Sequence, residues 1–162
     1  MLENFLAAQA LAFMLTFVRM GTAVMIMPGL GDSFLPERIR LHVALGLSFV
    51  LFPITAQYMP SPMPGTFALL FLIVTEFITG LFFGTVARVF MTALDTAGMV
   101  ISISSGLGNA QLFNPSLAVQ GSLMGAFMSM TGVLILFETN LHHLLIGGLL
   151  ESYVMFPVGG VP

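Results

Sequence analysis

The chain has 162 residues, of which 57% are hydrophobic and only 7% charged, and its mean hydropathy is +1.04. A soluble domain carries about 25% charged residues, so these values indicate an integral membrane protein or the apolar part of an assembly. Seven acids, four arginines and no lysine leave no basic patch for nucleic acid, and the lack of cysteine excludes disulfides and cysteine-ligated metals.

The first apolar run, residues 5–27, is about as long as a helix that spans a bilayer. Glu3 precedes it and no positive charge does, so it does not resemble a cleavable signal peptide. Arg19 lies deep in the run, where a guanidinium must pair, reach toward the end of the helix at Pro28, or face water.

Residues 28–40 carry four charges and are predicted to form a turn followed by the start of a second helix, which is expected over residues 37–52. Pro36 suits a helix start and Glu37 suits its positive end. Residues 53–65 contain four prolines and no charge, and this composition predicts an extended connector.

A long helix is predicted over residues 66–94, with Gly80 and Gly84 spaced for close helix packing. Glu76 and Arg88 are expected to be buried polar residues, like Arg19. A structural ion pair or hydrogen bond is favoured for Glu76 over a role in transport or proton relay. Arg88 lies two turns before Asp95 and could pair with it.

Residues 98–121 interrupt the membrane-like sequence with glycines, serines and the Asn114-Pro115 step, and they carry no charge. Such a stretch is not expected to continue as one helix, because Pro115 lacks an amide donor and restricts Asn114. Irregular backbone at membrane depth survives only when it is buried in protein or lines a wet passage. The stretch is therefore predicted to be the functional loop.

Another helix, residues 121–137, is predicted to begin with the small-residue pair Gly121 and Gly125 and to pack closely against a neighbour. Glu138 and His142 after it would share a helix face, which raises the hypothesis of a metal site. The spacing of zinc proteases and a third ligand are both missing, so capping or interfacial roles are favoured. The last residues, 157–162, are expected to form a turn that leads onward.

No catalytic motif emerges: neither a G-x-S-x-G elbow nor a phosphate-binding glycine loop is present. The chain is expected to be non-enzymatic, with no metal and no cofactor.

With these landmarks in order, the chain resembles the FliR family of type III secretion export-gate subunits over nearly its whole length. The landmarks are Phe17-x-Arg19, Pro28, Gly31, Pro36-x-Arg38, Leu45-Gly-Leu-Ser48, Pro53, Glu76-x-x-x-Gly80-x-x-x-Gly84, Ala97-Gly98, Gly106-Leu107, Asn114-Pro115, His142-His143, Ser152-Tyr153 and Phe156-Pro157. The family often has Gln near Ser104 or Ser105 and Asp at the position of Asn114, so this chain keeps the polarity there and loses a charge.

The resemblance implies an all-α fold of polytopic, membrane-type helical hairpins, with a broken segment and an inserted loop near 98–121. It implies one helical domain over 1–162 that lacks the carboxy-terminal helices of the family. It also implies a flagellar protein export gate in the bacterial inner membrane, at the basal body. There FliP-like and FliQ-like subunits would share the pore, through which unfolded flagellar proteins leave.

The resemblance further implies a plug that helps to close the pore. Its residues would be Ser104, Ser105, Gly106, Leu107, Gly108, Asn109, Ala110, Gln111, Leu112, Phe113, Asn114 and Pro115. Two alternatives remain: a small-solute membrane transporter with an interrupted helix, and a membrane metalloenzyme using Glu138, His142 and His143.

Overall fold

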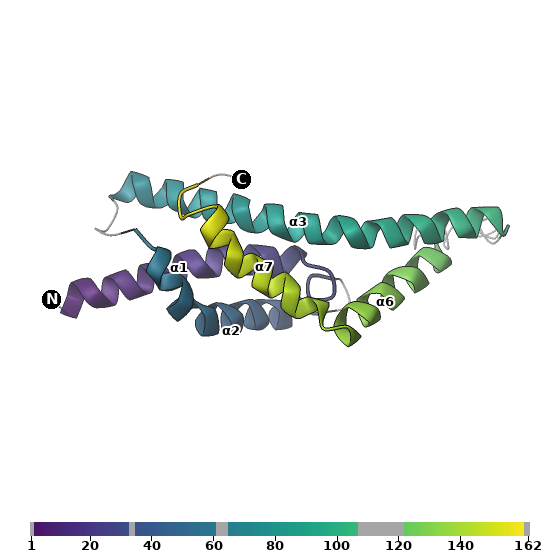
Figure 1. Ribbon diagram of the computed structural model, residues 1–162, viewed down its shortest axis with the longest axis horizontal. Helices are drawn as coiled ribbons and strands as arrows, with labels where there is room; N and C mark the ends of the chain where they lie inside the picture. The colour runs from purple at the N-terminus through teal and green to yellow at the C-terminus, as the bar shows by residue number, and fades with distance from the viewer. Residues whose placement is uncertain (1, 33–34, 61–64, 107–121, 161–162) are drawn as a thin grey trace. The chain divides into compact units, whose positions relative to one another are not determined.

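The computed structural model describes residues 2–32, 35–60, 65–106 and 122–160. Every regular element in these ranges is helical, which confirms the predicted all-α class. The elements, labelled as in Figure 1, are α1 (Leu2–Ile26), α2 (Glu37–Thr55), the 3-10 turn η1 (Ala56–Tyr58), α3 (Thr66–Ser104), α6 (Leu123–Glu138) and α7 (Leu141–Met155).

Three stretches of the described chain are long and apolar enough to cross a membrane: Phe5–Ile26, Glu37–Tyr58 and Thr66–Ser104. The number rises to four if α6 and α7, which pass the same test as a bent pair, count as one span. By length and composition, these helices are suited to a membrane protein.

Helix α2 runs further than the prolines of the sequence predicted. Pro53 lies inside it, and the helix continues to Thr55 before η1 adds one more turn. A proline this close to the end removes only one backbone hydrogen bond. The Thr55 hydroxyl donates to the carbonyl of Phe52 at 3.1 Å, and the Ala56 amide bonds to that same oxygen. The expected extended connector therefore begins only at Met59, and residues 61–64 lie outside the described ranges.

Helix α3 also continues past the predicted break at Gly98 and ends at Ser104. The serine-rich sequence fits a helix here because hydroxyls bond back to its carbonyls: Ser104 Oγ donates to the Val100 oxygen at 2.9 Å. The helix ends where Gly106 adopts φ 76°, the left-handed conformation that glycine adopts without strain after a helix. The start of the predicted interruption at Gly98 was thus wrong by several residues.

Contacts divide the chain into two compact units: residues 1–86 with 144–162, and residues 87–143. Helix α3 contributes its first part to one unit and its second part to the other. The single helical domain expected over 1–162 stays a prediction.

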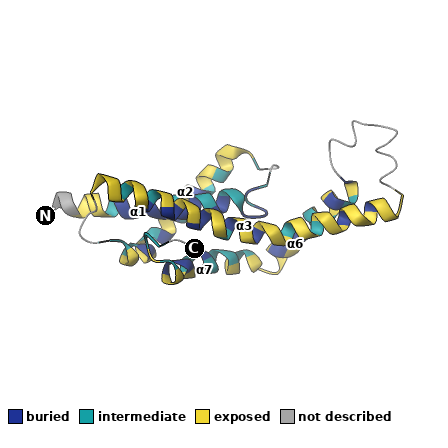
Figure 2. Cartoon of the chain, turned by 90° about the horizontal axis from the view of Figure 1, so that it is seen from above, coloured by how far each residue is buried: buried dark blue, intermediate teal, exposed yellow. Residues whose placement is uncertain are grey.

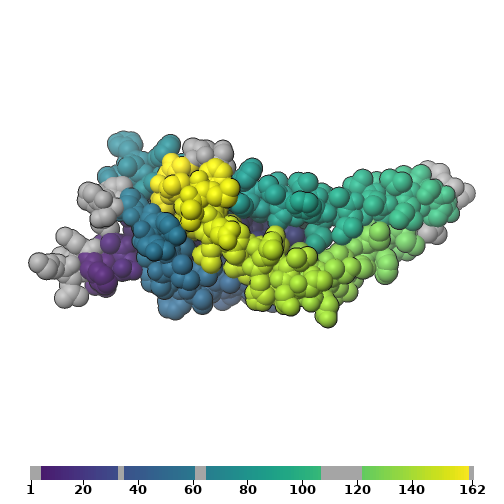
Figure 3. Space-filling view, viewed as in Figure 1, coloured from purple at the N-terminus to yellow at the C-terminus, as the bar shows by residue number. Residues whose placement is uncertain are grey.

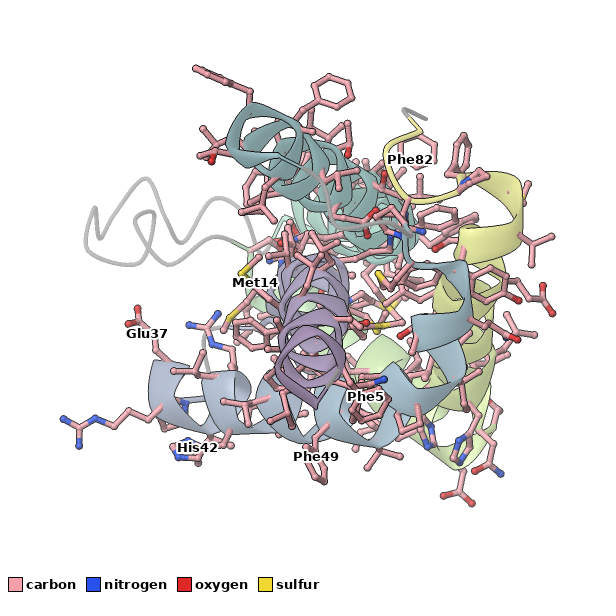
Figure 4. The ribbon with its side chains drawn as sticks, turned by 90° about the vertical axis from the view of Figure 1, so that its left-hand side faces the viewer. Phe5, Met14, Glu37, His42, Phe49 and Phe82 are labelled. Atoms are coloured by element: carbon pink, nitrogen blue, oxygen red, sulfur yellow. The ribbon has the colours of Figure 1, made fainter. Side chains whose placement is uncertain are left out.

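The first unit is built around α1, which holds more buried residues than any other element of that unit; buried positions are dark blue in Figure 2. Helix α2 lies along it, with His42 on the outer side of α2 (Figure 4), while the ring of Phe49 meets that of Phe13 in α1 edge to face at 6.4 Å. One core cluster joins Met20, Ala23, Leu51, Leu149 and Tyr153, and a second joins Leu11, Leu15 and Leu72. Figure 3 shows the yellow atoms of α7 against the blue atoms of the chain near the end of α2. The ring of Tyr58 in η1 stacks on that of Tyr153 in α7, with 5.9 Å between the ring centres.

The second unit pairs the latter part of α3 with α6. Ser122 caps the start of α6, because its hydroxyl oxygen accepts the amide of Gly125 at 3.2 Å. Where the two helices meet, a Cβ added to Gly98 would lie 2.6 Å from the Cα of Gly125. Only glycine allows backbones to approach this closely, so this contact fixes where α6 crosses α3.

Candidate functional site

The most unusual feature of the first unit is an ion pair that is closed off from solvent. Arg19 of α1 and Glu76 of α3 each have no exposed surface. Arg19 Nε lies 2.6 Å from Glu76 Oε2, and Nη2 lies 2.7 Å from Oε1. Two parallel bonds of this kind are the strongest arrangement available to arginine and carboxylate.

Helix α7 completes the surroundings of the guanidinium. Nη1 donates to the Ser152 hydroxyl at 3.1 Å, and Nη2 donates to the Phe156 carbonyl at 3.0 Å. The guanidinium carbon lies 3.9 Å from the centre of the Tyr153 ring, in a cation–π contact. Four of the five guanidinium N–H donors are therefore used, by residues from α3, α7 and the turn after α7.

The structure brings together residues that the sequence could not pair. Arg19 and Glu76 are 57 positions apart, and Ser152 is 133 positions from Arg19. No periodicity links such distant segments, although Phe17-x-Arg19, Glu76, Ser152-Tyr153 and Phe156-Pro157 were all among the landmarks of the resemblance. The favoured structural ion pair for Glu76 agrees with the observed geometry.

Arg88 does not lie where the sequence predicted, because it was expected to be buried. Its side chain is exposed in the isolated chain, as are those of its neighbours Val89 and Phe90. The position lies on the outward face of α3, so the helix rotation, which the sequence leaves undefined, determines its exposure. The expectation of a buried Arg88 is corrected accordingly.

At Gly80 and Gly84, the backbone of α3 lies directly against α1 of the same chain. A Cβ on Gly80 would collide with the backbone carbonyl oxygen of Arg19, and one on Gly84 would lie 2.9 Å from the carbonyl oxygen of Ala23. The predicted packing glycines thus serve an internal contact that also holds the ion pair in place. In the second unit Gly125 has the corresponding role, while Gly121 lies outside the described ranges.

Only the beginning of the predicted plug can be located. Ser104 is the last residue of α3, and Ser105 and Gly106 form the turn that follows, with the Gly106 amide bonded to the Ile103 carbonyl at 3.2 Å. Leu107, Gly108, Asn109, Ala110, Gln111, Leu112, Phe113, Asn114 and Pro115 lie outside the described ranges. The plug therefore stays a prediction.

Glu138 and His142 do not share a helix face, contrary to expectation. Helix α6 ends at Glu138, and Asn140 then adopts φ 58°, which reorients the chain before α7. The rings of His142 and His143 lie 4.2 Å apart, and that of Phe137 lies 5.0 Å from His142. No group of three His, Asp or Glu side chains suited to a metal ion occurs among the described residues.

An apolar groove between α1 and the first part of α3 was not predicted. Its volume is about 470 Å³. It is lined by Phe17, Val18, Gly21, Thr22, Met25, Ile26, Ile73, Phe77 and Leu81. The sequence indicated this groove through the small neighbouring residues Gly21 and Thr22, which leave a depression in the surface of a helix whose other side chains are bulky. With almost no polar lining, the groove offers no group for catalysis.

Comparison with known proteins agrees with the landmarks of the sequence. The chain is 41% identical over 152 residues to the flagellar biosynthetic protein FliR of Caulobacter vibrioides, covering 93% of this chain and 60% of that protein. It is 30% identical over 159 residues to the Yop proteins translocation protein T of Yersinia pestis, covering 98% of this chain and 60% of that protein. The FliR protein of Aquifex aeolicus is 30% identical over 149 residues, covering 92% and 57%.

The chain thus spans about 60% of the length of these relatives. Residues 10–162 match the family described as bacterial export proteins, family 1. This match includes the residues of the buried ion pair and covers most of the chain, which therefore belongs to the bacterial export proteins, family 1.

Proposed function

We propose that the chain is a non-enzymatic membrane subunit of a flagellar type III protein export gate. It would form part of the pore through which unfolded flagellar proteins are secreted, in the bacterial inner membrane at the flagellar basal body. FliP-like and FliQ-like subunits would be its partners. The observation that carries the proposal is 41% identity to a protein named for flagellar biosynthesis, along 93% of the chain.

The exposed surface supports a place inside a larger assembly. Phe67 is 90% exposed, Phe90 73% and Val100 61%, all on α3, and many other large apolar side chains are exposed as well. Such surface must be covered by lipid or by protein.

Residues 104–115 are proposed to close the pore at rest. A plug must exclude water and ions yet give way to a polypeptide, and this segment combines bulky apolar residues with glycines and carries no charge. Closed and open forms need differ by only a few kcal/mol for a substrate that prefers the open form to shift the population. The left-handed turn at Gly106 marks where the segment leaves α3.

Complementation tests the export function. A flagellated host lacking its own gene of this family would receive the gene for this protein, and swimming and secretion of flagellar subunits into the medium would be measured. We expect both to be restored, with FliP-like and FliQ-like proteins co-purifying. Normal production of the protein in the membrane without secretion or co-purification would refute the proposal.

Deletion of residues 106–111 tests the plug separately. At equal levels of assembled gate we expect higher membrane conductance and greater sensitivity to salt than in the parent strain. A small-solute transporter would instead lose uptake without leaking. A tight membrane in the deletion strain would remove the plug while leaving the export function standing.

A further inference from the structure

Arg19 makes more bonds than its ion pair requires. Nε and Nη2 bind the Glu76 carboxylate at two points, and the backbone of Gly159 in the turn after α7 also hydrogen-bonds to this carboxylate. The remaining bonds run to Ser152 Oγ in α7 and to the backbone oxygen of Phe156, one residue beyond its end. The guanidinium therefore links α1 and α3 to the place where the chain leaves α7.

The α1–α3 contact alone does not call for a buried charge. Gly80 and Gly84 already bring the two backbones together, and apolar residues of similar size often replace a buried ion pair without loss of stability. An apolar pair could not, however, donate hydrogen bonds in a fixed direction. The planar guanidinium group of arginine can, and here it donates hydrogen bonds to two acceptors outside the ion pair.

The turn after α7 is folded against the same region. Gly160 donates to the Pro157 carbonyl at 2.7 Å, and Gly159 adopts φ 90°, so the chain reverses sharply. Val158 packs against both core clusters, and the rings of Phe83 and Phe156 meet edge to face at 6.1 Å. These apolar contacts have little directional preference, whereas the two bonds from Arg19 fix one orientation.

We propose that Arg19 and Glu76 form a latch that positions the turn at residues 156–160 and so sets the direction in which the chain leaves α7. Glu76 holds the guanidinium in one orientation, and Arg19 carries that orientation to Ser152 and Phe156. Both are positioning residues for this turn. The inference depends on contacts within the first unit and does not rest on the proposed export function.

Because the chain contains no cysteine, single cysteines can report on the latch. Val158→Cys places a thiol in the turn. Ala44→Cys, at a fully buried position of α2, reports on the rest of the unit, and Val154→Cys, 67% exposed, gives the rate for an open site. Labelling of the whole protein by N-ethylmaleimide in detergent would be followed by mass spectrometry.

Each reporter is combined with Arg19→Met/Glu76→Met, which removes the latch without leaving a lone buried charge. The matched control is Thr75→Val/Thr79→Val. It also replaces two buried polar residues by apolar ones, but these hydroxyls bond only to carbonyls of their own helix. Ser152→Ala removes one of the two latch bonds to the α7 side.

We expect the latch variant to raise labelling at the Val158 reporter several-fold, toward the open-site rate, while the Ala44 reporter stays protected. Ser152→Ala should give a smaller rise, and the matched control none. Unchanged labelling of the Val158 reporter in the latch variant would overturn the proposal. So would a parallel rise at the Ala44 reporter, because the pair would then support the whole unit and not the turn.

Discussion

At the scale of single residues, we expect a single substitution in the buried ion pair to have a large effect on stability. Arg19 and Glu76 have no exposed surface, so neither charge can turn to water when its partner is lost. Removing one member of such a pair costs far more than replacing both, since the remaining charge is left without compensation.

We therefore predict that Glu76→Gln lowers the free energy of unfolding by about 3–5 kcal/mol. The amide can still accept a hydrogen bond, but it cannot balance the guanidinium charge. Thermal unfolding of the purified protein in detergent would measure the loss, with Thr79→Val as the control for a buried polar change in the same helix. A melting curve equal to that of the parent would contradict the prediction.

For the two histidines at the start of α7, by contrast, we expect substitution to have little effect. We predict that His142→Asn/His143→Asn leaves assembly and secretion near the parent level, because Asn retains some polar contacts and no group of three metal-ligating side chains occurs in the described part of the chain. Elemental analysis of the purified complex would be compared with secretion. Stoichiometric zinc or iron that disappears in the double variant together with secretion would show that the prediction is wrong.

At the scale of elements, helix existence was more predictable than helix ends. The apolar runs predicted α1, α3 and α6 because their length and composition suit a membrane. Pro53 and Gly98 did not end their helices, because local bonds and a close contact with Gly125 offset their weak helix preference. Such contacts depend on tertiary structure, which a local pattern does not contain.

The same reason explains what could be predicted of the candidate site. Arg19 and Glu76 were identifiable because charge is rare in apolar helices, and Gly80 and Gly84 because of their spacing. Their pairing across α1, α3 and α7 was not predictable, since it depends on how each helix is rotated. That rotation also explains why Arg88 is exposed.

The close contact between α3 and α1 at Gly80 gives a prediction with an internal control. Gly80→Ala should destabilise the protein by about 1–3 kcal/mol, because its Cβ would meet the Arg19 carbonyl and α3 would have to move away from α1. Gly46→Ala, in α2, meets nothing within 4 Å and should instead stabilise by about 0.5–1 kcal/mol through better helix preference.

Unfolding of both glycine variants in detergent, measured under identical conditions, would test this contrast. The same sign of change in the two variants would argue against a close α1–α3 contact at Gly80. The larger Gly84→Leu should be more damaging still, because its side chain must fit beside Ala23 and Ile26 of α1.

At the scale of the whole molecule, the exposed apolar surface determines how well the protein accumulates without a partner. Side chains such as Phe67, Phe90 and Met155 are at least 70% exposed in the isolated chain. We predict that the protein made alone accumulates poorly, and that production together with the proposed FliP-like and FliQ-like partners raises its level in the membrane several-fold. Quantitative immunoblotting would measure this, and equal levels with and without partners would contradict it.

Helix α3 has a consequence for how the protein is made. Its 39 residues correspond to about 58 Å at 1.5 Å per residue, whereas the hydrocarbon of a bilayer is about 30 Å thick. Such hydrophobic mismatch costs a fraction of a kcal/mol for each ångström and is relieved by strong tilt or by neighbouring protein. Newly inserted chains would therefore be held in an unfavourable state until neighbours arrive, which favours biogenesis in which the subunits are synthesised together and capture each other early.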